Sequence, residues 1–408
     1  MFTFISIIIL VISQEFPKSV FAQIQSETNK NRGYTQLERL QKKSLAKYSK
    51  LKRFLSTIDT KPPVTRSNGK LEPDLNGAQH NVKGPAIFAV SLMQQKELPY
   101  YPKSFVSTAR KAGFNGDIVL AFSTGMSDGF MEIVHKGKCV VYTIDLTCNG
   151  DTSTGHPLCT YQGSTSPAEA VPINMIRFQL YQYWASLYDE SAIIMISDFR
   201  DVLFQKNPFT YMADRWGPPV SQLAVFLESY PTKIIERCSF NSNWIKHCYG
   251  DLALKTIGLN PVSCSGVSIG SRDGILLYAY LINRQLDPVE RWGSGSGKDN
   301  SNCISTGMDQ GFHNWLVFSG VLERYIDITI FNQGEGPVNT LGALKPTKES
   351  LYHYNLTEWK VMKGQGDQKY IYNWNGDISP VVHQYDRFDA ADFEPHISKH
   401  LAILNGMF

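Results

Sequence analysis

From residue 84 onward, short apolar runs alternate with longer stretches in which apolar residues recur at helical spacing. Apolar runs of about four to eight residues between turn residues are typical of strands that a sheet buries on both faces. The sequence predicts strands at Ala86–Leu92, Asp117–Phe122, Cys139–Ile144, Ile193–Asp198, Leu223–Leu227 and Val262–Ile269. It predicts helices at Tyr101–Ala112, Ile173–Tyr188, Gly274–Leu286 and Met308–Phe318, with a further helix opened by Pro208. This alternation predicts the α/β class, with one mostly parallel central sheet flanked by helices.

The first 80 residues have a different pattern. Residues 1–22 contain the apolar stretch Phe2–Ile12 and end in Ser-Val-Phe-Ala. This pattern favours a secretory signal peptide, with an uncleaved signal anchor as the alternative. It predicts that the protein is located in the Golgi lumen or is secreted. Residues 23–80 are expected to form a basic stem or linker with a helix at Thr35–Ile58. A solvated spacer is favoured there over a helix that binds a membrane surface or a partner.

Composition and charge narrow the class of protein. A chain of 408 residues with 42% hydrophobic content can bury a large core, which we place in a single domain at residues 81–408. Residues 23–80 carry 12 Lys or Arg against 5 Asp or Glu, which leaves residues 81–408 net acidic. An acidic folded part argues against nucleic acid as a partner.

Seven cysteines occur without any Cys-x-x-Cys pair of the zinc-binding type. Disulfides therefore fit better, and they agree with an oxidising lumen. The expected pairs are Cys148 with Cys159, Cys238 with Cys248 and, more loosely, Cys264 with Cys303, leaving Cys139 buried. The sequon at Asn355 is compatible with a glycoprotein of that compartment.

Candidate chemistry begins where the strand Ile193–Asp198 ends. Asp198 and Asp201 follow the apolar run directly, with Arg200 between them. Open α/β sheets bind ligands at the edge where parallel strands end, so we expect these side chains to be exposed to a ligand there. Carboxylate oxygens are ligands that hard divalent cations prefer.

These acids resemble the strand-end motif of nucleotide-sugar transferases with the glycosyltransferase-A fold, especially the group that contains glycogenin and the lipopolysaccharide galactosyltransferases. Other segments resemble the motifs of that group in the same chain order. They are Arg177 in Asn-Met-Ile-Arg-Phe-Gln, the run Cys264-Ser265-Gly266-Val267, Asp309-Gln310 at a helix start, and His383 after a late apolar strand. The resemblance implies a single Rossmann-like glycosyltransferase-A domain.

The resemblance also implies roles for these residues. Asp198, Asp201 and His383 would hold Mn²⁺ or Mg²⁺, and donor binding would involve Asp198, Ser265, Gly266 and Gln310. Catalysis would depend on Asp309, Arg177 and Arg200. The implied activity is metal-assisted transfer of a hexose or pentose, with retention of configuration, from a nucleoside diphosphate sugar to a hydroxyl group of a glycan or glycoprotein.

One departure from the family pattern keeps alternatives open. The family carries Asp-x-Asp, whereas here the third position is Arg200 and the second acid is Asp201. Residues three apart on a strand point to opposite faces, so both acids reach one ion only if the chain turns at Phe199 or Arg200. Otherwise Arg200 itself meets the diphosphate. The displaced acid leaves open a secreted, non-catalytic carbohydrate-binding protein, while a metal-dependent phosphoesterase ranks last because the sequence lacks a second His and Asp group.

Each motif also has a simpler structural interpretation. Arg177 could pair with an acid on a helix surface, and Asp309 could be a first-turn acid that the helix dipole favours. His383 could be a core histidine whose hydrogen bonds are satisfied. The segment Gly334–Asn339 could form a wall beside the sugar or an ordinary turn.

Overall fold

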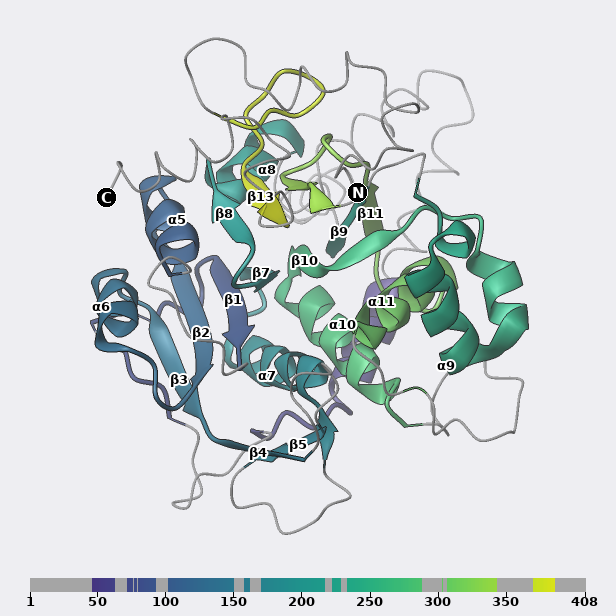
Figure 1. Cartoon of the computed structure of the whole chain (residues 1–408), viewed down its shortest axis with the longest axis horizontal. Helices are drawn as coiled ribbons and strands as arrows, with labels where there is room; N and C mark the ends of the chain where they lie inside the picture. Colours follow the sequence, from purple (N-terminus) through teal and green to yellow (C-terminus); the bar gives the residue numbers. More distant parts are fainter. Residues whose placement is uncertain are drawn as a thin grey trace, which may run out of the picture.

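A computed structural model describes residues 46–62, 72–75, 77–78, 80–92, 102–149, 158–161, 170–216, 222–228, 233–287, 303, 307–342 and 370–385. A seven-stranded sheet forms the centre of this part of the chain (Figure 1). Its strand order is β11 (Ile328–Phe331), β9 (Leu223–Leu227), β10 (Ser263–Ser271), β7 (Ile193–Asp198), β1 (Ala86–Ser91), β2 (Asp117–Ser123) and β3 (Val140–Ile144). All neighbours are parallel except β10, which runs antiparallel to β7 and β9. The predicted α/β class and mostly parallel sheet are therefore confirmed.

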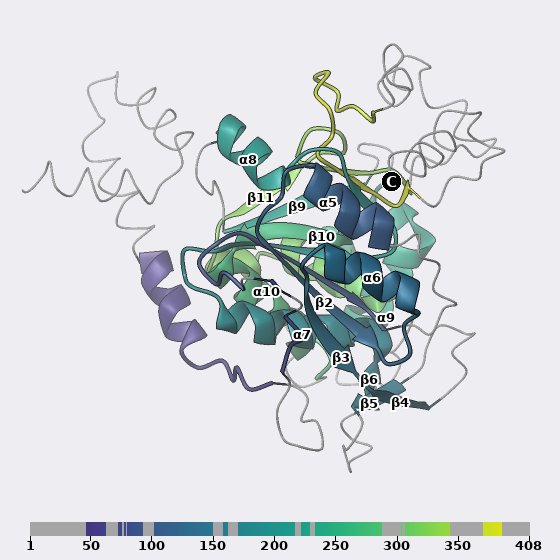
Figure 2. The same ribbon diagram turned by 90° about the vertical axis from the view of Figure 1, so that its left-hand side faces the viewer.

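Helices cover both faces of the sheet, because its central strands are apolar on both faces. In β1, Ala86 and Phe88 belong to one hydrophobic cluster while Ile87 and Ala89 belong to the other. This alternation follows from the two-residue period of a strand. Figure 2 shows the sheet between two groups of helices. One group includes α5 (Thr108–Lys111) and α6 (Asp128–Lys136), and the other includes α7 (Ile173–Leu187) and α10 (Arg272–Arg284).

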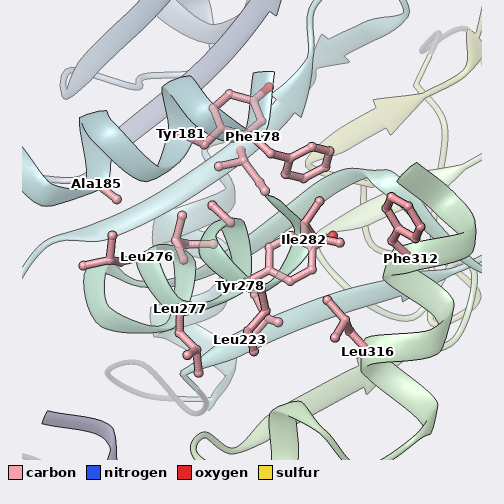
Figure 3. Packing of buried hydrophobic residues seen from close by; sticks show 14 of the residues in the cluster. Phe178, Tyr181, Ala185, Leu223, Leu276, Leu277, Tyr278, Ile282, Phe312 and Leu316 are labelled. Carbon is pink, nitrogen blue, oxygen red and sulfur yellow. The ribbon is translucent and has the colours of Figure 1, made fainter. Parts of the chain in front are cut away.

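The packing of α7 on α10 fixes the helices that carry site residues. Phe178 of α7 meets Tyr278 of α10 edge-to-face, with 6.0 Å between ring centroids. Figure 3 shows these residues together with Phe312 of α11 (Met308–Phe318). Because interiors are close-packed, these large side chains hold the first turns of α7 and α11 in place relative to the sheet.

A smaller sheet brings a late segment of the chain to the end of β7. Its strand order is β12 (Val338–Thr340), β13 (Val381–His383) and β8 (Val202–Phe204). β13 pairs antiparallel with β8, so that His383 lies opposite Val202. A third sheet, formed by β4 (Leu146–Asn149), β5 (Leu158–Tyr161) and β6 (Val171–Pro172), lies apart from this region (Figure 1).

Most predicted elements occur within a few residues of their expected bounds, but one long helix and several shorter elements were not predicted. The predicted helix at Tyr101–Ala112 is a π-helical turn, Lys103–Ser107, that continues into α5. α8 (Pro208–Trp216) begins at Pro208 as expected. The elements that were not predicted are α6, α9 (Ser239–Ile257), β4, β5, β6, β8, β11 and β12. α9 lacks a simple pattern because Gly250, with φ 85°, interrupts its helical backbone.

The helix at residues 46–55 packs against the domain, which differs from the expected solvated spacer. Leu51 is fully buried in the same cluster as α7 and α10. The Phe54 ring lies 4.9 Å from that of Tyr325. Lys52 forms ion pairs with Glu190 at 2.6 Å and Asp273 at 2.8 Å. The apolar face that suggested an amphipathic helix is therefore used within this chain.

The expected signal segment at residues 1–22 and the sequon at Asn355 lie outside the described residues. Among the helices of the described residues, none combines the length and the apolar character that crossing a membrane requires.

The disulfides correct part of the expected pairing. Cys148 bonds to Cys159 as predicted, but Cys248 bonds to Cys303. The expected pairs Cys238–Cys248 and Cys264–Cys303 are wrong. Cys238 and Cys248 lie at the start and in the third turn of α9, and ten residues of helix separate Cα atoms by roughly 15 Å, far beyond the reach of a disulfide. Cys238, Cys264 and the buried Cys139 are thiols.

The docked helix predicts a stability effect. We expect Leu51→Ala to lower the free energy of unfolding by about 2–4 kcal/mol, because it removes a fully buried side chain. Ser49→Ala, an exposed position on the same helix, should leave it unchanged. Denaturant unfolding of both variants measures the difference, and equal stabilities would show that the helix is not docked.

Peptide mapping without reduction tests the cystine assignment. We expect one linked peptide pair containing Cys248 and Cys303 and another containing Cys148 and Cys159. A link between Cys238 and Cys248 would contradict the packing of α9.

Candidate active site

The chain turns sharply after β7, and this turn gathers the two acids. β7 ends at Asp198, residues 199–201 form a turn, and β8 begins at Val202. The sequence requires a turn at Phe199 or Arg200 for Asp198 and Asp201 to reach one ion. This turn is present. Because β13 pairs with β8, His383 lies beside the same turn.

Asp198, Asp201 and His383 form a compact cluster. Each offers a ligand atom, and these atoms all lie within 4.8 Å of one another. His383 Nε2 is 3.4 Å from Asp198 Oδ2 and 3.8 Å from Asp201 Oδ1. On its other side, His383 Nδ1 lies 3.3 Å from the Thr340 hydroxyl, which leaves Nε2 facing the carboxylates.

The surroundings of the cluster fit a divalent cation. Two carboxylates and an imidazole are a suitable ligand set for Mn²⁺. A Cβ atom on Gly266 would lie 2.5 Å from both Asp198 Oδ2 and His383 Cε1, so only glycine leaves this space open. Contrary to our expectation of exposed strand-end acids, the Asp201 side chain is only 5% exposed.

Neighbouring charges control the protonation of the cluster. Burial by itself raises the pKa of Asp198, but the charge of Arg177 and the hydrogen bond with His383 outweigh it and hold that pKa well below its usual value. Burial lowers the pKa of His383, yet Cys264, Asp198 and Asp201 offset this and raise it well above its usual value. Asp198 is therefore an anion at neutral pH, as a metal ligand must be, whereas His383 would release its proton when a cation binds.

Arg177 connects this cluster to a second carboxylate. The guanidinium forms ion pairs with Asp198 through Nη1 and with Asp309 through Nη2. Asn174 Nδ2 donates to Asp309 Oδ1 at 2.7 Å, and the Ser265 hydroxyl donates to Asp309 Oδ2 at 2.9 Å. Asp309 is thus more than a first-turn acid, and Arg177 is not a surface residue.

Arg177, Asp198 and Asp309 line a cavity of about 700 Å³. Its size is typical of small-ligand sites. It extends along the edge where β1, β7 and β9 end and β10 begins. The predicted residues in its lining are Arg177, Asp198, Arg200, Asp201, Ser265, Gly266, Asp309 and Gln310. His383 lies beneath this lining against Gly266.

Gln310 lines the cavity but faces away from the acidic cluster, because its amide donates to Glu228 Oε1 and Asn241 Oδ1, both at 3.3 Å. Its role in donor binding stays a prediction. The segment Gly334–Asn339 is absent from the cavity lining, and Gly334 packs against the Trp374 ring instead. The turn interpretation holds for residues 334–337, while Val338 and Asn339 belong to β12.

Sequence reasoning missed the far half of the cavity. Glu228 directly follows β9, and Asp198 is the last residue of β7, so the same strand-end signal could have identified Glu228. Its carboxylate is 2% exposed and pairs with Lys233. Burial lowers the pKa of Lys233, but the Glu228 charge outweighs this and raises it. Phe240 and Trp244 of α9 complete the lining.

Comparisons with known proteins give only distant matches. No protein-family model and no curated protein matches the chain. Among solved structures, it is similar to the galactosyltransferase LgtC in complex with donor and acceptor sugar analogs. That match has 14% identity and a TM-score of 0.42, and covers 79% of this chain and 96% of the other. An active-site mutant of LgtC matches with 12% identity and a TM-score of 0.40, covering 79% and 95%. Similarity at this level leaves the function to be argued from the site itself.

Gly266 offers a direct test of the cation cluster. We expect Gly266→Ala to weaken Mn²⁺ binding about tenfold or more, because its methyl group must displace Asp198 or His383. Isothermal titration of the parent and the variant with MnCl₂ measures this, and a thermal midpoint for each shows whether the fold is retained. A folded variant with unchanged affinity would exclude the cluster as the binding site.

Proposed function

We propose that this chain is a glycosyltransferase that moves a sugar from a nucleoside diphosphate sugar to a hydroxyl group of a glycan or glycoprotein. One observation carries this proposal. A carboxylate and imidazole cluster, joined to a buried guanidinium, borders a large cavity at the end of parallel strands, and both of its carboxylates line that cavity. That combination suits a ligand with a diphosphate on one side and sugar hydroxyls on the other.

The proposed reaction exchanges one bond for another at the anomeric carbon. The acceptor oxygen bonds to that carbon, the bond to the diphosphate oxygen breaks with its electron pair staying on the diphosphate, and the hydroxyl proton passes to the released diphosphate or to water. Retention of configuration, which the motif resemblance implies, is part of the proposal, and NMR of the first-formed product tests it.

The chain's own residues divide the work along the sheet edge. Asp198, Asp201 and His383 would hold Mn²⁺ or Mg²⁺, which when bound stabilises the charge on the departing diphosphate. Arg177 orients Asp198 and Asp309 and adds positive charge between them. Asp309 accepts hydrogen bonds from hydroxyls of the transferred sugar, as it already accepts one from Ser265.

Arg200 and Gly266 have supporting roles in this proposal. Arg200 lines the cavity beside Asp198, and its carbonyl oxygen accepts a hydrogen bond from the Tyr385 hydroxyl at 3.0 Å, which anchors the turn. Its side chain is proposed to meet the diphosphate. Gly266 lets the sugar approach the cluster closely.

The non-catalytic alternative rested on the displaced second acid. The turn at residues 199–201 returns Asp201 to the cluster, which favours an enzyme over a binding protein.

We also propose that the protein works in the secretory pathway, in the Golgi lumen or after secretion. The two disulfides support this location, because such bonds persist in oxidising compartments.

Donor hydrolysis tests the proposed activity. We expect the protein with Mn²⁺ to release nucleoside diphosphate slowly from one or a few members of a nucleotide-sugar panel. Chelator or Asp198→Asn should lower that rate about 100-fold or more, because the charge that balances the leaving group is lost.

The matched control is Asp251→Asn, which changes an exposed acid on α9 and should retain the parent rate. Glycan binding without any nucleotide-sugar binding would support the carbohydrate-binding alternative. Full activity in chelator would exclude the cluster as a metal site.

A further inference from the structure

The order of strand ends divides the cavity into two halves. Asp198 ends β7, and Glu228 follows β9 at the same edge, with β10 between them. Two strand spacings separate these positions by roughly 10 Å. Adjacent residues of α11 face the two halves, since Asp309 pairs with Arg177 while Gln310 donates to Glu228. The half around Glu228 is not used by the cation cluster.

An aromatic pair on α9 borders this second half. The rings of Phe240 and Trp244 lie 5.9 Å apart and are inclined by 35°, and both line the cavity. Phe240 is 69% exposed although it belongs to the class of residue that folding normally buries. What distinguishes Phe240 from other exposed apolar residues is that its ring and that of Trp244 line a polar cavity, where they offer a surface on which the apolar face of a ligand can stack.

Two glycines at the start of α11 leave space for the Trp244 side chain. A Cβ on Gly307 would lie 2.4 Å from Trp244 Cζ2, and a Cβ on Gly311 would lie 2.7 Å from Trp244 Cβ. Both glycines therefore let α9 pack closely on α11. The Trp244 ring is held in place, and Phe240 extends from it toward solvent as the accessible part of the pair.

Polar groups lie on the inner side of the same half. Glu228 and Asn241 are 2% and 1% exposed, and Lys233 pairs with the Glu228 carboxylate. The contact from Gln310 to Glu228 is long, at 3.3 Å, and a carboxylate has about four acceptor positions. Glu228 can therefore accept a further hydrogen bond from a ligand hydroxyl.

We propose that this half of the cavity binds the acceptor, and that the acceptor presents a sugar ring there. The ring stacks its C–H face on Phe240 beside Trp244, and one of its hydroxyls donates to Glu228. A pyranose combines an apolar face with hydroxyls at its rim, which matches an aromatic wall opposite a buried carboxylate. This inference rests on the proposed function, and it selects a glycan acceptor over a bare peptide hydroxyl.

The test separates acceptor binding from donor chemistry. Phe240→Ala is compared with Leu252→Ala, which truncates a 75% exposed apolar residue on the same helix outside the cavity lining. Each variant is assayed for donor hydrolysis and for transfer to methyl hexosides, methyl pentosides and a serine-containing peptide. We expect Phe240→Ala to raise the KM for the sugar acceptor about tenfold or more while its donor hydrolysis stays within about twofold of the parent. Phe240→Tyr should restore the KM, and Leu252→Ala should match the parent.

Saturation-transfer NMR with the same methyl glycosides tests the binding without turnover. We expect the ring protons to be saturated by the parent and by Leu252→Ala, but not by Phe240→Ala. An active parent whose acceptor KM is insensitive to Phe240→Ala would overturn the inference and leave the proposed function standing. Efficient transfer to the peptide alone, or equal loss of donor hydrolysis and transfer in Phe240→Ala, would also overturn it. A parent without donor hydrolysis would instead contradict the proposed function, and the NMR result would then decide the sugar site separately.

Discussion

The Arg177 guanidinium lies between Asp198 and Asp309, and the geometry of the whole site depends on this buried pairing. The arginine comes from α7, while its partners end β7 and begin α11. Burying a cation is costly unless carboxylates pair with it closely, so the three elements must meet at one point. His313, which lies behind this group, stays neutral because burial and the Arg177 charge lower its pKa to about 3. The buried Arg177 guanidinium is therefore a fixed positive group between Asp198 and Asp309.

Hydrophobic packing supplies the rigidity that such a pairing needs. α7 packs on α10, and His313 on α11 lies within hydrogen-bonding distance of Tyr278 on α10 and Ser263 on β10, at 2.6 and 2.8 Å. Shifts of α7 or α11 would separate Arg177 from its partners. The short pairing of β8 with β13 fixes His383 in the same way. It holds His383 beside Asp201, although the two residues are 182 positions apart in the chain. Fold and proposed chemistry are thus linked by a few contacts between distant segments.

Sequence patterns gave the elements that carry the first half of the site. The apolar run ending at Asp198, the helix containing Arg177 and the helix that begins beside Asp309 were all predicted, because each has a regular local pattern. α9 was missed because Gly250 interrupts it and its apolar residues serve two different surfaces. With α9 unassigned, neither the cavity wall at Phe240 nor the partner of Cys248 could be identified.

The sequence by itself determined six of the strands in the central sheet, the helices α7, α10 and α11, and the acids at the end of β7, since these properties depend on residues close together in the chain. Only the tertiary structure decided that Asp201 turns back toward Asp198, that Cys248 bonds to Cys303 and that residues 46–55 dock on the domain. It also decided that Glu228 and Phe240 share a cavity with Asp198. These outcomes depend on which distant surfaces fit together when the apolar core closes, and local periodicity contains no information about that fit.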